Sequence, residues 1–500
     1  MNLLPLLLPV AVAGAPATFY PNAGPEQVTI EADGTLGGVQ VWRTGAVLVR
    51  TSDPDALGAL PGVVKVSALR GDGRTLRLVT ESGVDELALS RRLHGRADVQ
   101  WAHPDLVYRL VPMVTPNDPY FDGQWHLYNS GSGGGSPNVD INALPAWSVT
   151  TGEGAMVAVL DSGVDLTHPD LLVMSGWDYL DEDDDASPTD NGHGTSAAGL
   201  AAAVGDNGVG VTGVAWGAEV YAIRLIGGDT SLSDVHDAIV EASEAGAWVI
   251  NNSWGYGTDC PEIPAYGSTD RALDAAEEEG RGGLGAVVVF SAGNGGCDAS
   301  NNGLLMHPVV VAVAASNRRD RLESYSSFGE MVDITAPSGG VLTTDMVGAE
   351  LGYGSWEGDP DYTGSFSGTS ASAPIVSGVL TLMLAANPHL LASEAREALC
   401  ATAARIDVEG GGYDAEGWSP KYGCGRADAG AAVNAVANGL PALSTVLAPG
   451  SSAPVDRVVL RWETIDPDDD PVEWEVSWRL KDGEYQLVRV DEPWLDLTGD

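Results

Sequence analysis

The chain has few basic residues, and this scarcity excludes one broad class of function. It contains 25 Lys and Arg against 70 Asp and Glu, which gives a formal net charge of −45 at pH 7. A general nucleic-acid binder carries a basic surface, so the composition argues against that role. The acidity fits an exported protein that stays soluble, or a protein that binds cations, and it does not choose between the two.

Cysteines and long apolar runs are also scarce. The four cysteines show none of the C-x-x-C spacing that zinc sites use. Beyond the N-terminus, no run approaches the roughly 18 apolar residues that would span a bilayer, so we expect no membrane span. Apolar residues nevertheless make up 44 % of the 500 residues, which is enough for about three folded units and argues against wholesale disorder.

The first residues have the pattern of an export signal. Residues 1–15 form a short apolar run that ends in the small residues Ala11, Ala13 and Ala15, as at an A-x-A cleavage site, although a charged beginning is missing. We therefore expect a signal peptide at 1–15 and a secreted protein, extracellular or in the cell envelope. An even number of cysteines in such a protein favours disulfides over free thiols.

Two segments flank a larger central domain. Residues 16–115 read as a small α+β unit, with strands around a hairpin turn at 70–74, a short helix at 53–60 and a second at 83–94, in the β-α-β-β-α-β order of a split βαβ unit. Residues 439–454 read as a linker rich in Pro, Ser and Ala. Residues 455–500 alternate in the β manner and predict part of a fibronectin type III-like sandwich.

The central domain, 116–438, has the texture of an α/β fold. Short, nearly all-apolar runs such as AMVAVLD, VYAIRLI, WVINNSW, AVVVFSAG and VVVAVAA alternate with segments of helical spacing. This pattern predicts a parallel sheet covered by helices on both faces, with the chemistry at the carboxyl ends of the strands.

Three motifs in this domain carry residues suited to nucleophilic catalysis. AMVAVLDSGVDLTHPDL ends an apolar run on Asp161, DNGHGTSAAG places His193 at the start of a small-residue helix, and SFSGTSASAPIVSGVLTLML places Ser370 at the entry of a long apolar helix. Each alone also fits a helix cap or a structural loop residue. Together they form an Asp…His…Ser set in one of the known chain orders of the catalytic triad.

These motifs resemble the signatures of the subtilisin-like serine proteases, or subtilases. The resemblance covers about 118–438, and 16–115 resembles the inhibitory propeptide of that family. PNDPYFDGQWHL, DINALPAW and NNSWG are similar to the kexin-like branch. Asp161-Ser162-Gly163 departs from the two acidic residues of kexins, and the C-terminal tail does not resemble their P domain.

The resemblance implies a role for each residue of the site. Ser370 would be the nucleophile, His193 the general base and acid, and Asp161 the group that orients and stabilises the imidazole. Asn294, in FSAGNGG, matches the oxyanion-hole asparagine of the family, and the backbone N–H of Ser370 would be a second donor.

Substrate is expected to lie extended between two walls. By resemblance to the family, these walls consist of Ser253, Trp254, Gly255, Ser291, Ala292 and Gly293. Asp259 and Asp298 lie near this pocket in the sequence. The sequence leaves open whether they select basic substrate residues or bind a cation themselves.

Two loops predict structural Ca²⁺, which takes six to eight oxygen ligands. AVGDNGVGVTG resembles the high-affinity calcium loop of subtilases, and the ligands implied are Asp118, Asp170, Gly205, Asn207, Val209 and Val211. The acidic loop GWDYLDEDDDASPTD is either a solvated charge run or a second calcium site like that of kexin-like relatives. The matching ligands there are Asp178, Asp183 and Asp185.

The positions of the cysteines predict their pairing. Cys260 and Cys297 each follow a strand of the predicted parallel sheet, so their loops should lie within reach of a disulfide. Cys400 and Cys424 close a local loop of about 24 residues, which in the chain-entropy model contributes roughly 3 kcal/mol. We therefore expect Cys260–Cys297 and Cys400–Cys424.

The sequence as a whole favours a secreted, calcium-stabilised serine endopeptidase that is made as a zymogen. Its partners would be protein or peptide substrates and its own propeptide as an intramolecular inhibitor. The alternative is a catalytically silent subtilase-like module that binds at a surface, against which the complete triad and Asn294 weigh. A lipase or esterase would need G-x-S-x-G, and residues 368–372 lack the final glycine.

Overall fold

The structure is a computed structural model, and it divides the chain into two compact units, Met1–Val111 and Pro112–Asp500. It describes residues 17–108 and 114–437 with gaps, and short strands after 441 by their backbone alone. The gaps fall at 22–27, 31–34, 37–38, 58–59, 70–73, 82, 132–133, 258–259 and 349–351. The predicted signal peptide lies outside the described residues.

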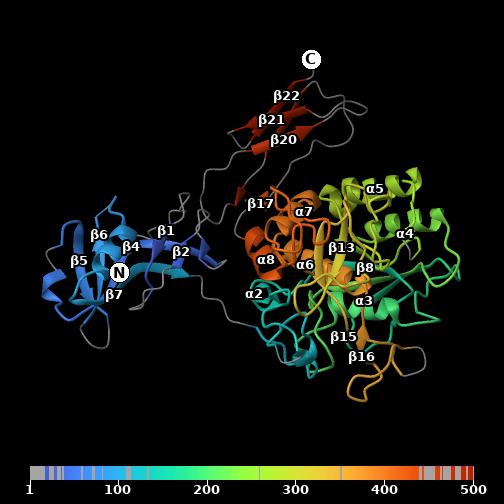
Figure 1. Ribbon diagram of the computed structural model, residues 1–500. Coiled ribbons are helices and arrows are strands. Elements are labelled where there is room, and N and C mark those ends of the chain that lie inside the picture. The colour runs from blue at the N-terminus through green and yellow to red at the C-terminus, as the bar shows by residue number, and fades with distance from the viewer. Residues whose placement is uncertain are drawn as a thin grey trace. The chain divides into compact units, whose positions relative to one another are not determined.

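The first unit is built around the long strand β4, which pairs antiparallel with β6 on one edge and with β7 on the other, while β5 extends the sheet beyond β6 (Figure 1). The elements are β1 (Ala17–Phe19), β2 (Val28–Ile30), β3 (Thr35–Leu36), β4 (Val39–Thr51), β5 (Val63–Ala68), β6 (Thr75–Thr80), α1 (Glu86–His94) and β7 (Val99–Tyr108). The strand order β7-β4-β6-β5 is that of the split βαβ unit.

The helices of this unit differ from each other in how well the sequence defines them. Asp85 caps α1 by accepting hydrogen bonds from the backbone N–H groups of Leu87 and Ala88, and the buried leucines of α1 pack on the sheet. The helix predicted at 53–60 is reduced to a single 3₁₀ turn, Asp55–Leu57. Eight residues interrupted by proline and glycine are too few to stabilise an α-helix by themselves.

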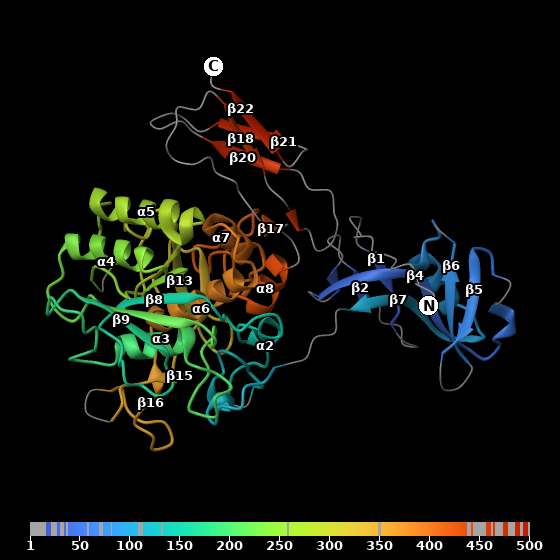
Figure 2. The same cartoon turned by 180° about the vertical axis from the view of Figure 1, so that it is seen from behind.

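The second unit contains a seven-stranded, wholly parallel sheet in the order β14-β13-β12-β11-β8-β10-β9. Figure 1 labels β8 and β13 of this sheet, and Figure 2 also labels β9. The strands are β8 (Met156–Asp161), β9 (Val173–Asp178), β10 (Glu219–Arg224), β11 (Val249–Asn252), β12 (Val287–Ser291), β13 (Val310–Ser316) and β14 (Ile334–Pro337). All five apolar runs of the sequence form strands of this sheet, which confirms the predicted α/β class. The outer strands β9 and β14 were not predicted.

Helices cover both faces of the sheet, as the continuous apolar strands require. The helices are α2 (Ala143–Trp147), α3 (His193–Ala202), α4 (Leu232–Glu244), α5 (Gly267–Gly283), α6 (Thr369–Ala386), α7 (Ala392–Ala401) and α8 (Ala429–Ala437). Val157 and Val159 face the core under α3 and α6, whereas Ala158 and Leu160 face the core under α4 and α5. Because successive side chains of β8 point to opposite faces of the sheet, this strand contributes to two separate cores.

Helix α6 runs through the first of these cores. It is the helix among the described residues that is long and apolar enough to cross a membrane, and 89 % of that stretch is buried inside the protein. Its apolar character is therefore that of a core helix. An antiparallel pair, β15 (Val341–Thr344) and β16 (Tyr362–Phe366), precedes it and leads directly to its first turn.

The C-terminal segment consists of short antiparallel pairs: β17 with β19, β18 with β22, and β20 with β21. Their bounds are β17 (Ala442–Leu443), β18 (Arg457–Arg461), β19 (Thr464–Ile465), β20 (Trp474–Trp478), β21 (Gln486–Val490) and β22 (Trp494–Thr498). The predicted β character is confirmed. Assembly into a sandwich stays a prediction, and the predicted linker at 439–454 is described only at β17.

Candidate active site

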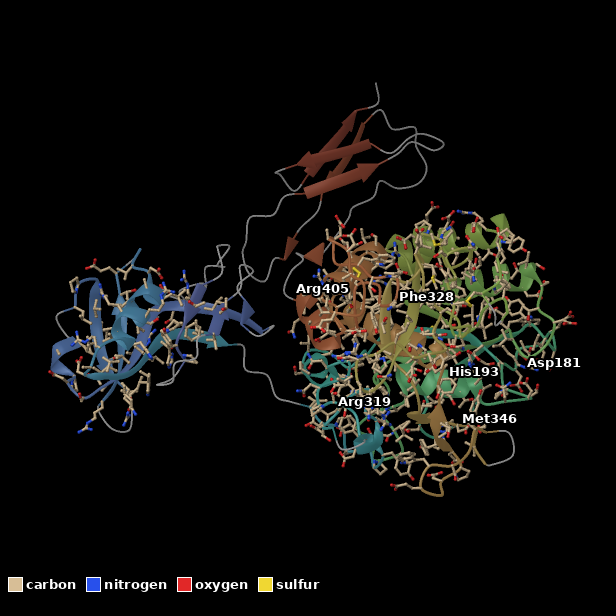
Figure 3. All side chains as sticks on the ribbon, in the orientation of Figure 1. Asp181, His193, Arg319, Phe328, Met346 and Arg405 are labelled. Carbon is tan, nitrogen blue, oxygen red and sulfur yellow. A yellow bond between two sulfur atoms is a disulfide. The ribbon has the colours of Figure 1, made fainter. Side chains whose placement is uncertain are left out.

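Asp161 and His193 form the best-defined pair of the site. Asp161 ends β8 and is wholly buried, while His193 opens α3, and His193 Nδ1 lies 2.7 Å from Asp161 Oδ1. A Cβ on Gly194 would collide with the carbonyl oxygen of Gly163, so the glycine after the histidine lets α3 approach the end of β8 this closely. In Figure 3, His193 lies within the body of the unit.

The imidazole is held as a base. Burial opposes its protonation, but the charge of Asp161 and the hydrogen bond to that carboxylate together outweigh this effect, and the pKa of His193 is raised. A carboxylate can only accept a hydrogen bond, so Nδ1 carries the proton and Nε2 is the basic nitrogen. This is the tautomer that a general base needs.

Ser370 is the second residue of α6, and an unusual pair of hydrogen bonds holds it. Its Oγ donates to the carbonyl oxygen of Ser253 over 3.0 Å, and the Oγ of Ser253 donates to the carbonyl oxygen of Ser370 over 3.1 Å. In a regular helix that carbonyl would accept from the N–H of residue 374. Residue 374 is proline and has no N–H, so the hydroxyl of Ser253 takes its place.

Asn294 presents a free donor beside the start of α6. Its Oδ1 accepts hydrogen bonds from Thr369 N at 2.8 Å and from Thr369 Oγ1 at 3.0 Å. Since a backbone N–H can only donate, the oxygen must face Thr369, and Nδ2 makes no hydrogen bond with any described residue. A Cβ on Gly368 would lie 3.1 Å from this Nδ2, so the glycine keeps the approach open.

The predicted substrate walls follow β11 and β12, as the parallel sheet requires. Ser253, Trp254 and Gly255 come directly after β11, whereas Ser291 ends β12 and Ala292 and Gly293 follow it. The indole of Trp254 points inward: its Nε1 donates to the carbonyl oxygen of Leu160 at 2.9 Å, and its ring packs edge-on against Phe290. The Nε1 of Trp254 is therefore engaged within the protein, while the side chain as a whole is half-buried.

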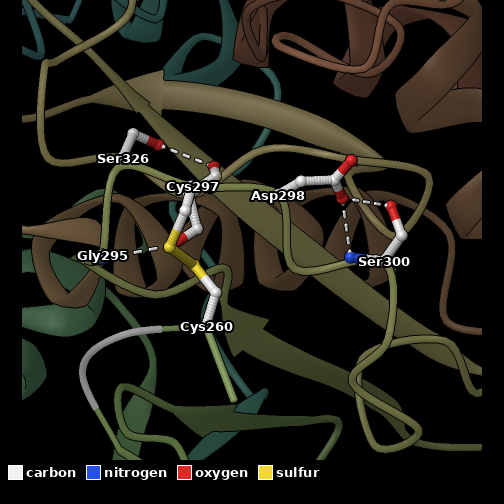
Figure 4. The surroundings of a disulfide bond; sticks show 7 residues. Cys260, Gly295, Cys297, Asp298, Ser300 and Ser326 are labelled. Atoms are coloured by element: carbon white, nitrogen blue, oxygen red, sulfur yellow. Dashed lines mark hydrogen bonds between the residues drawn. A yellow bond between two sulfur atoms is a disulfide. The ribbon is translucent and has the colours of Figure 1, made fainter. Parts of the chain in front are cut away.

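Both predicted disulfides are present, with Cα separations of 6.2 Å for Cys260–Cys297 and 5.3 Å for Cys400–Cys424. Figure 4 shows the first bridge, which joins the loop after β11 to the loop after β12. The carboxylate of Asp298 accepts from both the N–H and the hydroxyl of Ser300, and these bonds lower its pKa. It thus caps its own loop, while Asp259 lies outside the described residues.

The loop predicted to bind calcium donates hydrogen bonds to two buried carboxylates. Asp170 accepts hydrogen bonds from Asn207 Nδ2 and Val211 N, each at 2.8 Å, and Asp118 accepts from the backbone N–H groups of residues 206–208. Burial, with the charge of Asp118, raises the pKa of Asp170 to about 6. No described Lys or Arg pairs with either carboxylate.

Backbone oxygens complete this fit. The carbonyl oxygens of Gly205, Val209 and Val211 accept no hydrogen bond from any part of the chain that the structure describes. The loop 205–211 therefore has three carbonyl oxygens that accept no hydrogen bond, and it contacts two buried carboxylates, Asp118 and Asp170, that have no positive partner among the described residues. That donor set suits Ca²⁺.

In the acidic loop, an arginine engages the first of the three predicted ligands, and the other two are exposed, as in a solvated charge run. Asp178 ends β9 and is buried against Arg224, whose Nη1 lies 2.5 Å from Asp178 Oδ2 and 2.6 Å from Asp181 Oδ2. Asp183 and Asp185 are exposed and accept hydrogen bonds from backbone N–H groups of their own turn. The described residues contain no group of three His, Cys, Asp or Glu side chains placed to hold a metal.

Sequence reasoning missed three residues that shape the site. The Thr369 hydroxyl accepts a hydrogen bond from the N–H of Gly293 and donates one to Asn294, so it joins a predicted wall residue to the predicted oxyanion-hole residue. Pro374 and Arg224 were also missed. All three stand in segments quoted above, but only Pro374 carries a local signal, because a proline six residues into a predicted helix leaves the carbonyl four residues earlier without a helical donor.

The subtilase family model matches residues 152–427, which is more than half of the chain and includes every catalytic candidate. The chain is 35 % identical to a calcium-dependent protease of Trichormus variabilis over 391 residues, covering 73 % of this chain and 57 % of that relative. It is 34 % identical to thermitase of Thermoactinomyces vulgaris, covering 59 % of this chain and 94 % of thermitase.

Among solved structures, the serine protease of Aeromonas sobria superposes with a TM-score of 0.60 at 26 % identity, covering 79 % of this chain and 74 % of that one. Of the two curated relatives, the chain spans less than two thirds of the length of the calcium-dependent protease and most of the length of thermitase.

Proposed function

Because the chain belongs to the subtilase family, we propose that it is a secreted, calcium-stabilised serine endopeptidase that is made as a zymogen. The observation that carries the proposal is the 2.7 Å contact between His193 and the buried Asp161, on a chain that also places Ser370 at the entry of α6. The substrates would be proteins or peptides.

The chemistry begins with a change of hydrogen-bond partner at Ser370. In the resting state its hydroxyl donates to the carbonyl oxygen of Ser253. For attack on a peptide carbonyl, the proton of Oγ passes to His193 Nε2 while Oγ forms the bond to carbon. The imidazolium is stabilised by Asp161 and then returns the proton to the leaving amine, and water cleaves the acyl-enzyme by the same steps.

The oxyanion formed in each half-reaction needs preorganised donors. Asn294 supplies its free Nδ2, and the bonds from Thr369 fix the orientation of that amide. The backbone N–H of Ser370, at the N-terminus of an 18-residue helix, would be the second donor. Both donors are held by the fold, so neither has to be reoriented when negative charge develops on the substrate oxygen.

Substrate would lie extended along the backbone of the two walls. An incoming backbone N–H that bonds to the Ser253 carbonyl would displace the hydroxyl of Ser370 from it, and this exchange would free the nucleophile. Because the carboxylate of Asp298 is engaged by its own loop, it does not indicate which substrate residue is preferred. Profiling a peptide library would determine that preference.

We further propose that Ca²⁺ is held by the loop 205–211 together with Asp118 and Asp170. When bound, the ion neutralises two buried carboxylates and fixes the loop. Chelation should therefore lower the melting temperature, since a ligand of the native state stabilises it. Asp170→Asn should remove most of that dependence, and an equal loss on chelation in the variant would contradict the assignment. The relative named a calcium-dependent protease is consistent with this proposal.

A second calcium ion at the acidic loop would have to compete with Arg224 for Asp178. We therefore expect the double variant of Asp183 and Asp185 to alanine to change the response to chelator less than Asp170→Asn does. A larger change would show that the acidic loop is the main calcium site.

Residues 16–115 are proposed to act as the intramolecular inhibitor, with self-cleavage near Met113–Asn117. The boundary between the two compact units falls just before this segment and is consistent with it. N-terminal sequencing of the mature enzyme tests the point, and a start well beyond residue 130 would refute it. Secretion is tested by recovery of the mature enzyme from culture medium.

The deciding experiment for the activity compares the full-length protein with Ser370→Ala. The parent should react with a fluorophosphonate probe and cleave casein, whereas the variant should do neither. Because the triad acts as a unit, His193→Ala should lose nearly as much activity as Ser370→Ala. A parent that neither labels nor cleaves after maturation would instead favour the silent binding module.

A further inference from the structure

An open cavity of about 510 Å³ lies on the second unit, and it shares no residue with the candidate active site. It is bounded by the outer strand β9 and the turn after it, by β10 and by α4. Its lining residues are Ser175, Gly176, Trp177, Tyr179, Asp184, Tyr221, Asp237 and Glu241. Asp181, labelled at the rim of the unit in Figure 3, belongs to the same turn.

The absence of a side chain at residue 176 lets the cavity walls meet. A Cβ on Gly176 would lie 2.7 Å from Cε1 of Tyr221 and 2.9 Å from Oε1 of Glu241. A larger residue would therefore push β9 away from both β10 and α4. Glycine at this point of the outer strand brings Tyr221 and Glu241 against the backbone of β9.

Glu241 is built into the floor of this cavity. Its Oε1 accepts hydrogen bonds from Trp177 N at 2.9 Å and from the hydroxyl of Tyr221 at 3.1 Å, and its Oε2 accepts from the hydroxyl of Tyr179 at 2.9 Å. All three donors are neutral. The carboxylate is thus oriented firmly, but its charge is not cancelled.

Two further carboxylates add to this negative charge. Asp184 and Asp237 are exposed at the cavity, and neither they nor Glu241 make an ion pair with any described residue. No Lys, Arg or His lines the cavity. The nearby Arg224 is already engaged by Asp178 and Asp181. No positively charged side chain among the described residues therefore neutralises the charge of this cavity.

Aromatic rings form the rest of the wall. Trp177 is 39 % exposed, and the rings of Tyr179 and Tyr221 lie on either side of Glu241. An aromatic face attracts a cation within about 6 Å of its centre, and tryptophan does so best. Tyr and Trp faces beside free carboxylates suit a cation that is flat and can also donate hydrogen bonds.

We propose that this cavity binds the guanidinium group of an arginine side chain that a protein or peptide partner presents. A planar guanidinium can stack on Trp177 while its N–H groups donate to Asp184 and Asp237. A quaternary ammonium has no N–H for these carboxylates, and an ammonium has no flat face for the indole.

The neighbouring strand edge favours a peptide over a free small cation. Among the described strands, β9 pairs only with β10. At its other edge the turn 183–186 bonds to Ser175 and Asp178, so only the part of this edge before Ser175 has no described partner. Leu172 and Met174, just before the cavity, are 52 % and 39 % exposed. They offer apolar contact to the residues that flank the arginine of an extended segment.

The test uses the full-length Ser370→Ala protein, so that no probe is cleaved, and it does not depend on whether the parent is a protease. Acetyl-Leu-Arg-Leu-amide is titrated by calorimetry at low salt, beside the same peptide with the neutral isostere citrulline, and beside agmatine. We expect saturable binding of the arginine peptide, with at least tenfold weaker binding of the citrulline peptide and of agmatine.

Variants then locate the site. Asp237→Asn and Trp177→Ala should each weaken the arginine peptide at least threefold, and the double variant at least tenfold. Glu244→Gln, on the exposed face of the same helix and outside the cavity, is the matched control and should bind as the parent does. Melting curves establish that the variants are folded.

Two results would overturn the proposal. One is the lack of any difference between the arginine and citrulline peptides. The other is arginine-dependent binding that survives the double variant, since this would place the site elsewhere on the chain. Agmatine that binds as tightly as the peptide would refute the preference for a peptide partner.

Discussion

His126 is the residue whose replacement gives the most quantitative test of the structure. Its imidazole is completely buried, and neither ring nitrogen makes a hydrogen bond with any described residue. Burial, helped by the positive charge of Arg318, lowers the pKa of His126 to about 3. The folded protein therefore keeps this histidine neutral, whereas the unfolded chain protonates it near pH 6.5.

The direction of the pH effect follows from this difference. Between about pH 6.5 and pH 3 the unfolded chain binds a proton that the folded protein does not, so stability falls as the pH falls. Each pH unit costs about 1.4 kcal/mol of the free energy of unfolding. At pH 4.5, two units below the unfolded value, His126 should cost roughly 2.7 kcal/mol relative to neutral pH.

His126→Leu removes this contribution because leucine has nothing to titrate. In the Ser370→Ala background, which avoids self-digestion, we expect the melting temperature to fall by about 5 °C less between pH 7.5 and pH 4.5 than in the parent. His389→Leu, which replaces an exposed histidine of the same unit, is the control. Equal falls in His126→Leu and the parent would refute the reasoning, whatever the absolute stability of the variant.

Three further predictions concern the active site. Asp161→Asn should lower kcat/KM and move the acid limb of its pH profile to lower pH. The reason is that the carboxylate of Asp161 raises the pKa of His193, whereas burial alone would lower it. An acid limb that does not move would contradict this prediction. Asn294→Leu should reduce kcat by about 10²–10³ with little change in KM, a range that comes from such a donor in subtilisin, and steady-state kinetics on a peptide substrate decide the matter. Removing the Cys260–Cys297 bridge with serines should raise KM and also lower the melting temperature, by the equivalent of about 4 kcal/mol, whereas removing the other bridge should affect only the melting temperature.

The sequence reveals the parts of the fold that depend on continuous apolar burial. The five inner strands and the helix that carries Ser370 follow from their apolar runs, because strands buried on both faces admit few polar residues. Strand β9 escaped prediction for the opposite reason. It lies at an edge, contains Ser175 and Gly176, and runs straight into the acidic loop, so its composition resembles that of a loop.

The candidate site also has residues that the local sequence predicts and contacts that it does not predict. Asp161, His193, Ser370 and Asn294 stand in motifs, and their elements follow from the local sequence. The partners that hold them depend on chain segments far apart in sequence, and no local pattern encodes these contacts. Arg224 illustrates this, because only the register between β9 and β10 places its guanidinium against Asp178. The sequence of the acidic loop, taken alone, shows only negative charge and gives no sign of this arginine.

The hydrogen bond from Ser253 to the carbonyl of Ser370 couples the residue types at positions 253 and 374, which are far apart in the sequence. The two serines are 117 residues apart, and the bond exists because Pro374 leaves that carbonyl without a helical donor. If residue 374 changed to alanine, the helix would supply its own donor, and the carbonyl of residue 370 would no longer depend on the hydroxyl at 253. In divergent copies of this gene, proline at 374 and a hydroxyl at 253 should therefore be kept or lost together.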